Sequence, residues 1–312
     1  MKYALLCSGQ AGQSAELLDA LLAASDLADL RALAGELLGE PLERWWRGLG
    51  SEGVFENGPA QFAIALYQIA AWTRLKPLLP PPAVVAGYSL GEVVAWHVAG
   101  ALDARATLQL VRERAALMDR HAPAAGGGLL LWRGRSTPAM RAVRDRCMQA
   151  HGLAIAIQRP DGSLVLGGTR AGIARFLAEP ELAGVDLRHL PVSVPSHTPL
   201  LAGAVQPFAE RIASYPFQTI DTAVLAGIDA HPQHRQEEAV VSLSSQLAGT
   251  LRWDWCTETL LSLGVAAAIE LGPGKDLATQ LQTCAGIPAR ALSEFGSPAA
   301  CADWLQAHID AV

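Results

Sequence analysis

The chain has 312 residues, 51% hydrophobic and 17% charged, which allows a sizeable buried core and argues against a disordered protein. A net charge of −6 without a dense run of Lys or Arg argues against nucleic-acid binding. The five cysteines are widely spaced, so neither a disulfide framework nor a metal site is indicated. The N-terminus shows no signal-type cleavage site, and no stretch reaches the roughly 18 apolar residues of a membrane span, so we expect a cytoplasmic protein.

The first 121 residues contain short apolar runs and longer segments of helical periodicity. The apolar runs predict strands over residues 3–7 and 83–86. The periodicity predicts helices over about 15–38 (with a break), 60–75, 92–99 and 105–121. The run at 83–86 carries no charge, so we place this strand in the centre of a parallel sheet, buried on both faces.

A Pro/Ala/Gly stretch at residues 122–128 marks a hinge. The elements predicted after it are β-α-β-β-α-β, over residues 129–132, 137–151, 153–158, 163–166, 169–177 and 186–194. This order is that of the ferredoxin-like split unit, so residues 125–193 are expected to form a small inserted subdomain. Residues 1–124 and 194–312 then form the large α/β domain, with further helices near 200–215, 237–247 and 255–263 and a strand near 266–271.

Ser89 lies in the sequence Gly-Tyr-Ser-Leu-Gly at 87–91, between the central strand and a helix. In this context a G-x-S-x-G sequence predicts a strained turn that exposes a nucleophilic serine. The turn also aims the first amides of the helix, beginning with Leu90, at the place where an oxyanion forms. The alternative is that the two glycines only let the strand and helix pack closely. Cys7, which precedes a glycine loop, is expected to pack as a small hydrophobe.

A serine nucleophile needs a base, usually a histidine, and the chain has eight. His197 differs from the others because it follows the strand that leaves the insert and lies between Pro195 and Pro199, which stiffen its turn. The remaining seven lie on the helix that follows Ser89, near predicted helix ends, on the insert or in polar loops: His97, His121, His151, His189, His231, His234 and His308.

Arg114 lies on the helix predicted over 105–121. The apolar face of that helix is formed by Leu108, Val111, Ala115 and Met118. Arg114 stands at the edge of this face, whereas Arg112 and Glu113 point elsewhere. From position alone, Arg114 is expected to be an amphipathic side chain that reaches solvent.

Five segments carry short motifs in a fixed order: SGQAGQ at 8–13, GYSLGE at 87–92, VPSH at 194–197, QL with LRW at 246–253, and LGPG at 271–274. In this order they resemble the motifs of the malonyl-CoA:acyl-carrier-protein transacylase family over essentially the whole chain. The resemblance implies an α/β-hydrolase-like core with a ferredoxin-like insert. It also implies an acyltransferase that works through an acyl-serine intermediate.

The resemblance implies roles for individual residues. It makes Ser89 the nucleophile and His197 the base, and it places the oxyanion between the amides of Gln10 and Leu90. These enzymes have no triad carboxylate; a backbone carbonyl orients the histidine, and Gln246 matches that position.

The same resemblance implies the substrates. Arg114 matches the arginine that pairs with the free carboxylate of malonyl, a task suited to the two parallel N–H groups of a guanidinium. The acyl donor is then malonyl-CoA and the acceptor is the phosphopantetheine-type thiol of an acyl carrier protein. No bound cofactor and no metal ligand are implied.

The chain departs from the family pattern beside the expected site. Tyr88 replaces the usual His, Cys7-Ser8 replaces Phe-Pro, and Gly58 replaces a frequent Gln. The Tyr88 variant resembles the transacylase (epsilon) subunit of bacterial malonate decarboxylase, which implies loading of that enzyme's carrier and contact with its other subunits. The alternatives are the transacylase of fatty-acid synthesis, an α/β-hydrolase thioesterase, and a scaffold that only binds a carrier protein.

Overall fold

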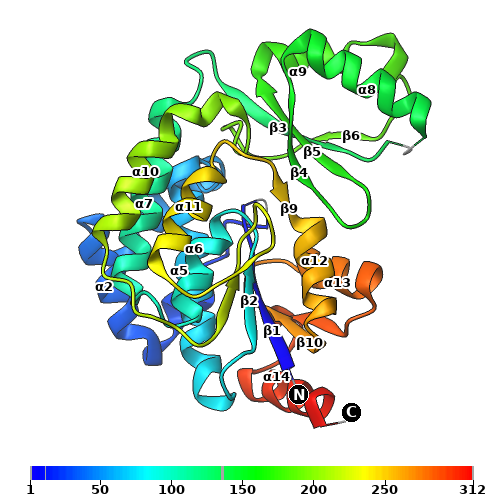
Figure 1. Cartoon of the computed structure of the whole chain (residues 1–312). Coiled ribbons are helices and arrows are strands. Elements are labelled where there is room, and N and C mark those ends of the chain that lie inside the picture. Colours follow the sequence, from blue (N-terminus) through cyan, green and yellow to red (C-terminus); the bar gives the residue numbers. More distant parts are fainter. Residues whose placement is uncertain (1, 11, 135–136, 311–312) are drawn as a thin grey trace.

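The computed structural model describes residues 2–10, 12–134 and 137–310, and these residues contain two sheets (Figure 1). The strands of the larger sheet are β1 (Lys2–Cys7), β2 (Val84–Gly87), β7 (Ala223–Leu225), β8 (Pro232–Gln233), β10 (Val265–Glu270) and β11 (Ala289–Ala291). Their order is β11-β10-β1-β2-β7-β8, and every neighbouring pair is parallel except β7 with β8. The strand predicted at 83–86 is therefore central in a largely parallel sheet, as expected.

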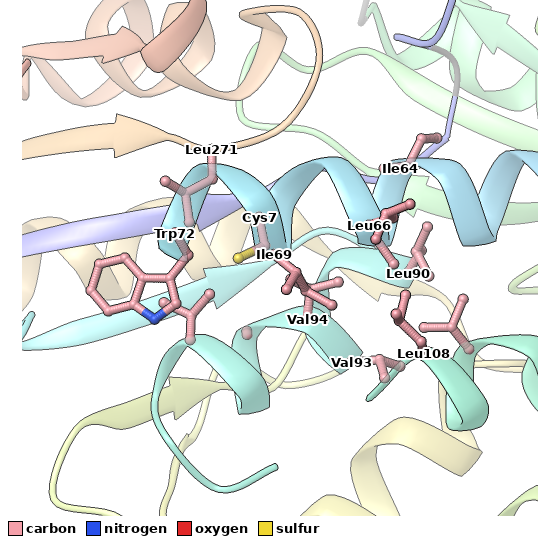
Figure 2. Close-up of a cluster of buried hydrophobic side chains, with 14 of the residues drawn as sticks. Cys7, Ile64, Leu66, Ile69, Trp72, Leu90, Val93, Val94, Leu108 and Leu271 are labelled. Carbon is pink, nitrogen blue, oxygen red and sulfur yellow. The ribbon is translucent and has the colours of Figure 1, made fainter. Parts of the chain in front are cut away.

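Side chains along β1 alternate between two hydrophobic cores. Tyr3, Leu5 and Cys7 belong to the core on one face, and Ala4 and Leu6 belong to the core on the other. Because both faces are covered, the strand needs no polar side chains, and this explains its uninterrupted apolar run. Figure 2 shows Cys7 within the first core, among buried side chains such as Ile69 and Val94.

Helices cover both faces of this sheet (Figure 1). The first face carries α2 (Ala28–Leu38), α5 (Asn57–Leu75), α6 (Leu90–Val98), α7 (Ala104–His121), α10 (Ala202–Ser214), α11 (Gln236–Ser245) and α14 (Pro298–Asp310). The second face carries α12 (Trp253–Ser262) and α13 (Asp276–Ala285). Short helices complete the connections: α1 (Asp19–Ala23), α3 (Leu42–Gly48), α4 (Gly50–Gly53), and the 3₁₀ turns Ser25–Leu27, Lys76–Leu78, Pro180–Leu182, Pro199–Leu201 and Leu292–Glu294.

The smaller sheet contains β3 (Gly127–Trp132), β4 (Ala154–Gln158), β5 (Leu164–Thr169), β6 (Leu187–His189) and β9 (Leu251–Arg252) in the order β6-β3-β5-β4-β9. One face packs under α8 (Pro138–His151) and α9 (Arg170–Leu177) through residues such as Leu130 and Trp132. The opposite face, with Leu129 and Leu131, joins the second core, which also covers the larger sheet. The small sheet is thus fixed to the larger sheet by apolar packing.

The chain order of the small sheet is β3-α8-β4-β5-α9-β6, which is the expected ferredoxin-like order. The last strand is shorter than the predicted 186–194 and covers only Leu187–His189. Pro191 interrupts that segment, and a proline cannot donate a ladder hydrogen bond. β9 joins the edge of this sheet from the C-terminal part of the chain and pairs in parallel with β4.

Within the three described ranges, no helix combines the length and the apolar character that a bilayer crossing requires.

Candidate active site

Ser89 lies in the turn between β2 and α6, and it is the residue that precedes the helix. Its φ of 58° and ψ of −114° form a strained conformation for a side chain other than glycine. A Cβ at Gly87 would lie 2.2 Å from the Glu92 backbone, and a Cβ at Gly91 would lie 2.0 Å from the Cys7 carbonyl oxygen. Only glycine fits at these two positions, so the strained elbow expected from the sequence is confirmed.

His197 lies against Ser89 with its imidazole fixed at both nitrogens. Its Nε2 is 2.7 Å from Ser89 Oγ, and its Nδ1 is 2.5 Å from the backbone carbonyl oxygen of Gln246. A carbonyl oxygen only accepts hydrogen bonds, so the proton of the neutral ring belongs on Nδ1. Nε2 is then left to accept the hydroxyl proton of the serine, which is the arrangement a general base requires.

The environment of His197 keeps the imidazole neutral. Burial and the nearby positive charge of Arg114 lower the pKa of His197 to about 3, against a smaller opposing effect of the Gln246 carbonyl. The backbone is also strained here, with φ at 62°. A neutral imidazole at physiological pH is able to take a proton, whereas an imidazolium is not.

Arg114 on α7 is fully buried behind the serine. Its Nη1 donates to Gln61 Oε1 at 2.7 Å, and its Nη2 donates to Ser89 Oγ at 3.2 Å. Burial lowers the pKa of Arg114 to about 10, which still leaves the guanidinium charged at neutral pH. The expectation from position alone, a side chain that reaches solvent, is wrong.

The charge of Arg114 has no acidic side chain within 4.0 Å among the residues that the structure describes. Its Nε is also buried without a hydrogen-bond partner. The predicted apolar face of α7 is confirmed, and the exposed Arg112 points elsewhere, toward the Leu37 carbonyl.

Leu90 and Gln10 lie where two loops meet at the serine. Leu90 is the first residue of α6, so its N–H has no carbonyl one turn earlier in the helix to bond. A Cβ at Gly9 would lie 2.7 Å from the Tyr88 carbonyl oxygen, which shows how closely the glycine loop packs on the elbow. Gln10 lines the same cavity as Ser89. The neighbouring Ala11 of the predicted motif lies outside the described residues.

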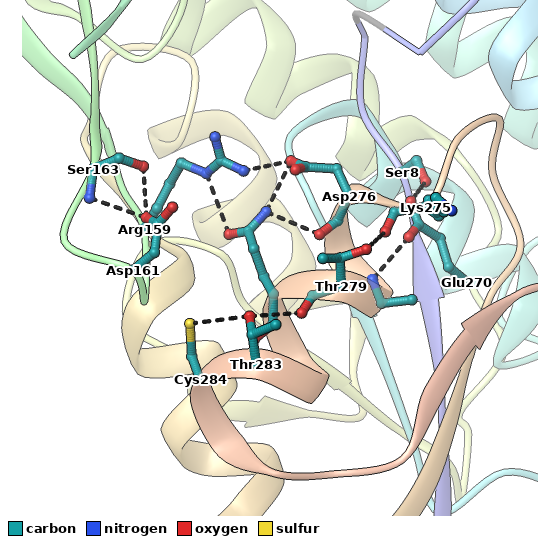
Figure 3. A network of polar contacts seen from close by, with 12 residues as sticks. Ser8, Arg159, Asp161, Ser163, Glu270, Lys275, Asp276, Thr279, Thr283 and Cys284 are labelled. Carbon is teal, nitrogen blue, oxygen red and sulfur yellow. Dashed lines mark hydrogen bonds and ion pairs between the residues drawn. The ribbon is translucent and has the colours of Figure 1, made fainter. Parts of the chain in front are cut away.

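Two buried side chains clamp the start of the glycine loop. Gln68 accepts from the Ser8 N–H at 2.7 Å and donates to the Ser8 carbonyl at 3.1 Å. Ser8 Oγ donates to Glu270 Oε1 at 2.5 Å, and the other oxygen of Glu270 accepts from the Ala278 N–H at 2.8 Å (Figure 3). Cys7, just before this loop, is buried with a raised pKa, in agreement with its expected role as a packing residue.

A cavity in front of Ser89, called here the Ser89 pocket, lies between the two sheets. Mainly polar groups line one side, and the segment between β3 and the histidine loop contributes a mostly apolar wall on the other. The lining residues are Gln10, Tyr88, Ser89, Ser196, His197 and Asp276 on the first side, and Leu129, Ile157, Arg159, Val165, Leu190 and Val192 on the second. The pocket thus combines an apolar wall with a few converging polar groups, as ligand sites usually do.

Sequence reasoning missed Arg159 and Asp276 of this pocket and the contact that Tyr88 makes. Arg159 follows β4 and donates to Asp276 Oδ2 at 2.5 Å and to Gln280 Oε1 at 3.2 Å, which links the small sheet to α13 (Figure 3). Tyr88 packs edge-on against Trp253 with ring centroids 5.4 Å apart. No local pattern marks these contacts, because the partners come from distant segments.

Among the described residues, one group of three potential metal-binding side chains lies close together: Cys147, Glu179 and Glu181. None of the three lines the Ser89 pocket.

A strained serine, a neutral histidine held by a carbonyl, and a buried arginine define a site suited to acyl transfer through serine. The sequence model of the family described as "Acyl transferase domain" matches residues 51–252. A malonyl CoA-acyl carrier protein transacylase of Haemophilus influenzae is 30% identical over 290 residues, covering 88% of this chain and 90% of that protein. A protein of the same name from Bacillus subtilis is 29% identical over 221 residues, covering 70% and 69%.

Solved structures show the same fold. A malonyl-CoA:acyl carrier protein transacylase from Xanthomonas oryzae superposes with a TM-score of 0.84 at 29% identity, covering 99% of each chain. An acyl carrier protein S-malonyltransferase from Vibrio cholerae gives 0.83 at 28% identity, covering 95% of this chain and 98% of the other. The chain therefore belongs to the acyl transferase family, which it shares with the malonyl-CoA:acyl-carrier-protein transacylases, and it is an acyltransferase.

Proposed function

We propose that this enzyme transfers a malonyl group from malonyl-CoA to the thiol of an acyl carrier protein through a malonyl ester on Ser89. The observation that carries the proposal is Arg114, which is charged, fully buried and 3.2 Å from Ser89 Oγ without an acidic partner among the described residues. A buried unpaired charge is costly, and an acyl group with a free carboxylate supplies the missing partner. Acetyl and fatty acyl groups lack that carboxylate.

The first half-reaction forms the acyl-enzyme. His197 Nε2 takes the hydroxyl proton as Ser89 Oγ attacks the thioester carbonyl carbon. The negative charge that develops on the carbonyl oxygen is placed between the backbone N–H groups of Gln10 and Leu90. When the carbon–sulfur bond breaks, the imidazolium returns its proton to the departing CoA sulfur, which leaves as a thiol.

The second half-reaction uses the same groups in reverse. The carrier thiol gives its proton to His197 and attacks the malonyl ester, and Ser89 recovers its proton as the ester bond breaks. Transfer requires that water is kept from the ester. We propose that residues 125–193 act as an inserted subdomain whose apolar side chains Leu129, Ile157 and Val165 shield the malonyl ester from water.

The identity of the acceptor is the second part of the proposal. The relatives that match along most of this chain carry names that specify malonyl-CoA and an acyl carrier protein. They favour a carrier of the fatty-acid-synthesis type for this enzyme. Loading of a malonate decarboxylase carrier is supported by one feature, Tyr88, which lines the Ser89 pocket.

Single-turnover loading tests the acceptor. The enzyme is acylated with malonyl-CoA, freed of excess substrate, and mixed either with a fatty-acid-type acyl carrier protein or with a decarboxylase carrier. We expect faster transfer to the acyl carrier protein. Faster transfer to the decarboxylase carrier would reverse this assignment, and hydrolysis at an equal rate with and without a thiol would identify a thioesterase.

A further inference from the structure

The orientation of His197 depends on a backbone carbonyl, and a side-chain network holds that carbonyl in place. Gln246 caps the C-terminal end of α11, and its carbonyl oxygen is the atom bonded to Nδ1 of the histidine. The side chain of the same residue, which is fully buried, donates from Nε2 to Glu92 Oε2 at 2.9 Å. The residue that orients the base is therefore anchored to a carboxyl group 154 positions away in the sequence.

Glu92 is well placed to act as that anchor. It lies in the first turn of α6, and its backbone N–H donates to the Ser89 carbonyl at 3.0 Å. The oxygen that accepts from Gln246 also accepts from the Gly227 N–H at 2.8 Å. A Cβ at Gly227 would lie 3.0 Å from this oxygen, a tight contact that would require the carboxyl group to shift. One fully buried carboxyl group thus joins the serine elbow, the 227 turn and the end of α11.

We propose that Glu92 is a positioning residue for His197: it holds Gln246 so that the carbonyl orients the imidazole, and its negative charge stabilises the imidazolium formed during proton transfer. The inference rests on the proposed function of Ser89 and His197. The two ring nitrogens of His197 are bonded to the Ser89 hydroxyl and the Gln246 carbonyl rather than to a carboxylate, and the charge of Arg114 opposes a second positive charge nearby. A carboxylate behind Gln246 offsets that opposition through the same hydrogen-bonded chain.

The charge of Glu92 changes near neutral pH. Burial raises the pKa of Glu92 to about 7, against the opposing effects of the Gly227 N–H, of the Ser242 side chain and of Arg114. The other titratable groups that act on it are Arg114 on α7, the exposed Asp229 in the turn after β7, and Cys256 on α12; His197 is linked to it through Gln246. Arg114 stays protonated, burial keeps the Cys256 thiol protonated by raising its pKa, and His197 stays neutral. A step in rate between about pH 6 and 8 is therefore assigned to Glu92.

The test measures the rate of acyl-enzyme formation from pH 5.5 to 8.5 by quenched-flow mass spectrometry. The donor is malonyl-pantetheine, which has no phosphate that titrates in this range. In the unaltered enzyme the rate should rise as Glu92 ionises. Glu92→Gln keeps the acceptor oxygen for Gly227 and Gln246 but cannot ionise, so its acylation rate should not change with pH. At pH 8 this rate should be about tenfold below that of the unaltered enzyme, a loss of the size found when a group that orients a functional histidine is replaced.

Two further variants test whether Glu92 acts through Gln246 and whether a different buried carboxyl group causes the pH step. Gln246→Met keeps the backbone carbonyl but loses the bond to Glu92, so it should also slow acylation, and Glu92→Gln should then add little. Glu270→Gln removes a second buried carboxyl group whose pKa is also raised to about 7, and it should keep the pH step. A cooperative thermal unfolding transition is required of each variant, as the control that it is folded.

Three results would contradict the role of Glu92, and a different result would contradict the proposed function. A pH profile of Glu92→Gln that superposes on that of the unaltered enzyme, a pH step that vanishes in Glu270→Gln alone, or an unchanged rate in Gln246→Met would overturn the inference. An unaltered enzyme that forms no acyl-enzyme at any pH would instead overturn the proposed function, so the two failures are distinguishable.

Discussion

Replacing Arg114 by Gln should remove the preference of the enzyme for an acidic acyl group. The guanidinium is buried and bonded to Gln61 and Ser89, and its pKa of about 10 keeps it charged. A charge-assisted contact whose loss leaves a buried carboxylate unpaired is worth about 2–4 kcal/mol. At 1.4 kcal/mol per factor of ten, the malonyl-to-acetyl ratio of kcat/KM should fall by roughly 30- to 700-fold.

The assay compares kcat/KM for malonyl-CoA and acetyl-CoA with one carrier protein. The change in the ratio should come from malonyl-CoA, because acetyl has no carboxylate to lose its partner. Loss of the contacts of Arg114 with Ser89 and His197 should affect both substrates alike and cancel in the ratio. Arg112→Gln is the matched control, since Arg112 lies two residues earlier on the same helix and is exposed. A malonyl-to-acetyl ratio in Arg114→Gln equal to that of the control would refute the reasoning.

Further predictions concern the stability of the fold. Gly91→Ala should lower the unfolding temperature strongly or prevent folding, because the new Cβ would lie 2.0 Å from the Cys7 carbonyl oxygen. Gly58→Ala is the control and should be tolerated, because a Cβ there meets no atom within 4 Å. Equal unfolding temperatures for the two variants would contradict this prediction. Glu270 has a folded-state pKa of about 7, above the ordinary value of 4.5, so its folded form keeps a proton that the unfolded chain releases and the protein loses stability as pH rises through that interval. Chemical denaturation should therefore show Glu270→Gln gaining roughly 1–3 kcal/mol relative to the unaltered protein between pH 5 and pH 8, and a difference that is constant with pH would argue against a raised pKa.

The elements that the sequence predicts well are those whose signal is local. The elbow at Ser89 depends on a charge-free strand, two glycines and a helix that follow one another directly, and the structure has this arrangement. The β-α-β-β-α-β order of the small sheet is equally visible in the periodicity of residues 129–189.

The elements that sequence reasoning missed are short or lack a clear apolar period. α13 contains polar residues on much of its surface, and β9 and β11 have only two and three residues. β9 exists because β4 offers it a hydrogen-bonding edge, a property of the assembled sheet that no local pattern records.

The site residues also divide into those with a local sequence signal and those defined by contacts between distant segments. His197 is marked by its prolines, but Arg114 is buried with a hydrogen bond to Gln61 of α5, which lies 53 positions away. The link between Glu92 and Gln246 spans 154 positions, and that between Arg159 and Asp276 spans 117. Periodicity places a residue on a helix face, whereas only the packing of separate helices decides which charges become buried.

The central claim is that Ser89 carries the malonyl group, and intact-protein mass spectrometry after brief exposure to malonyl-CoA tests it most directly. The unaltered enzyme should gain the mass of one malonyl group, peptide mapping should place it on Ser89, and addition of an acyl carrier protein should remove it. Ser89→Ala should gain no mass under the same conditions. A malonyl adduct of equal yield in Ser89→Ala would contradict the account.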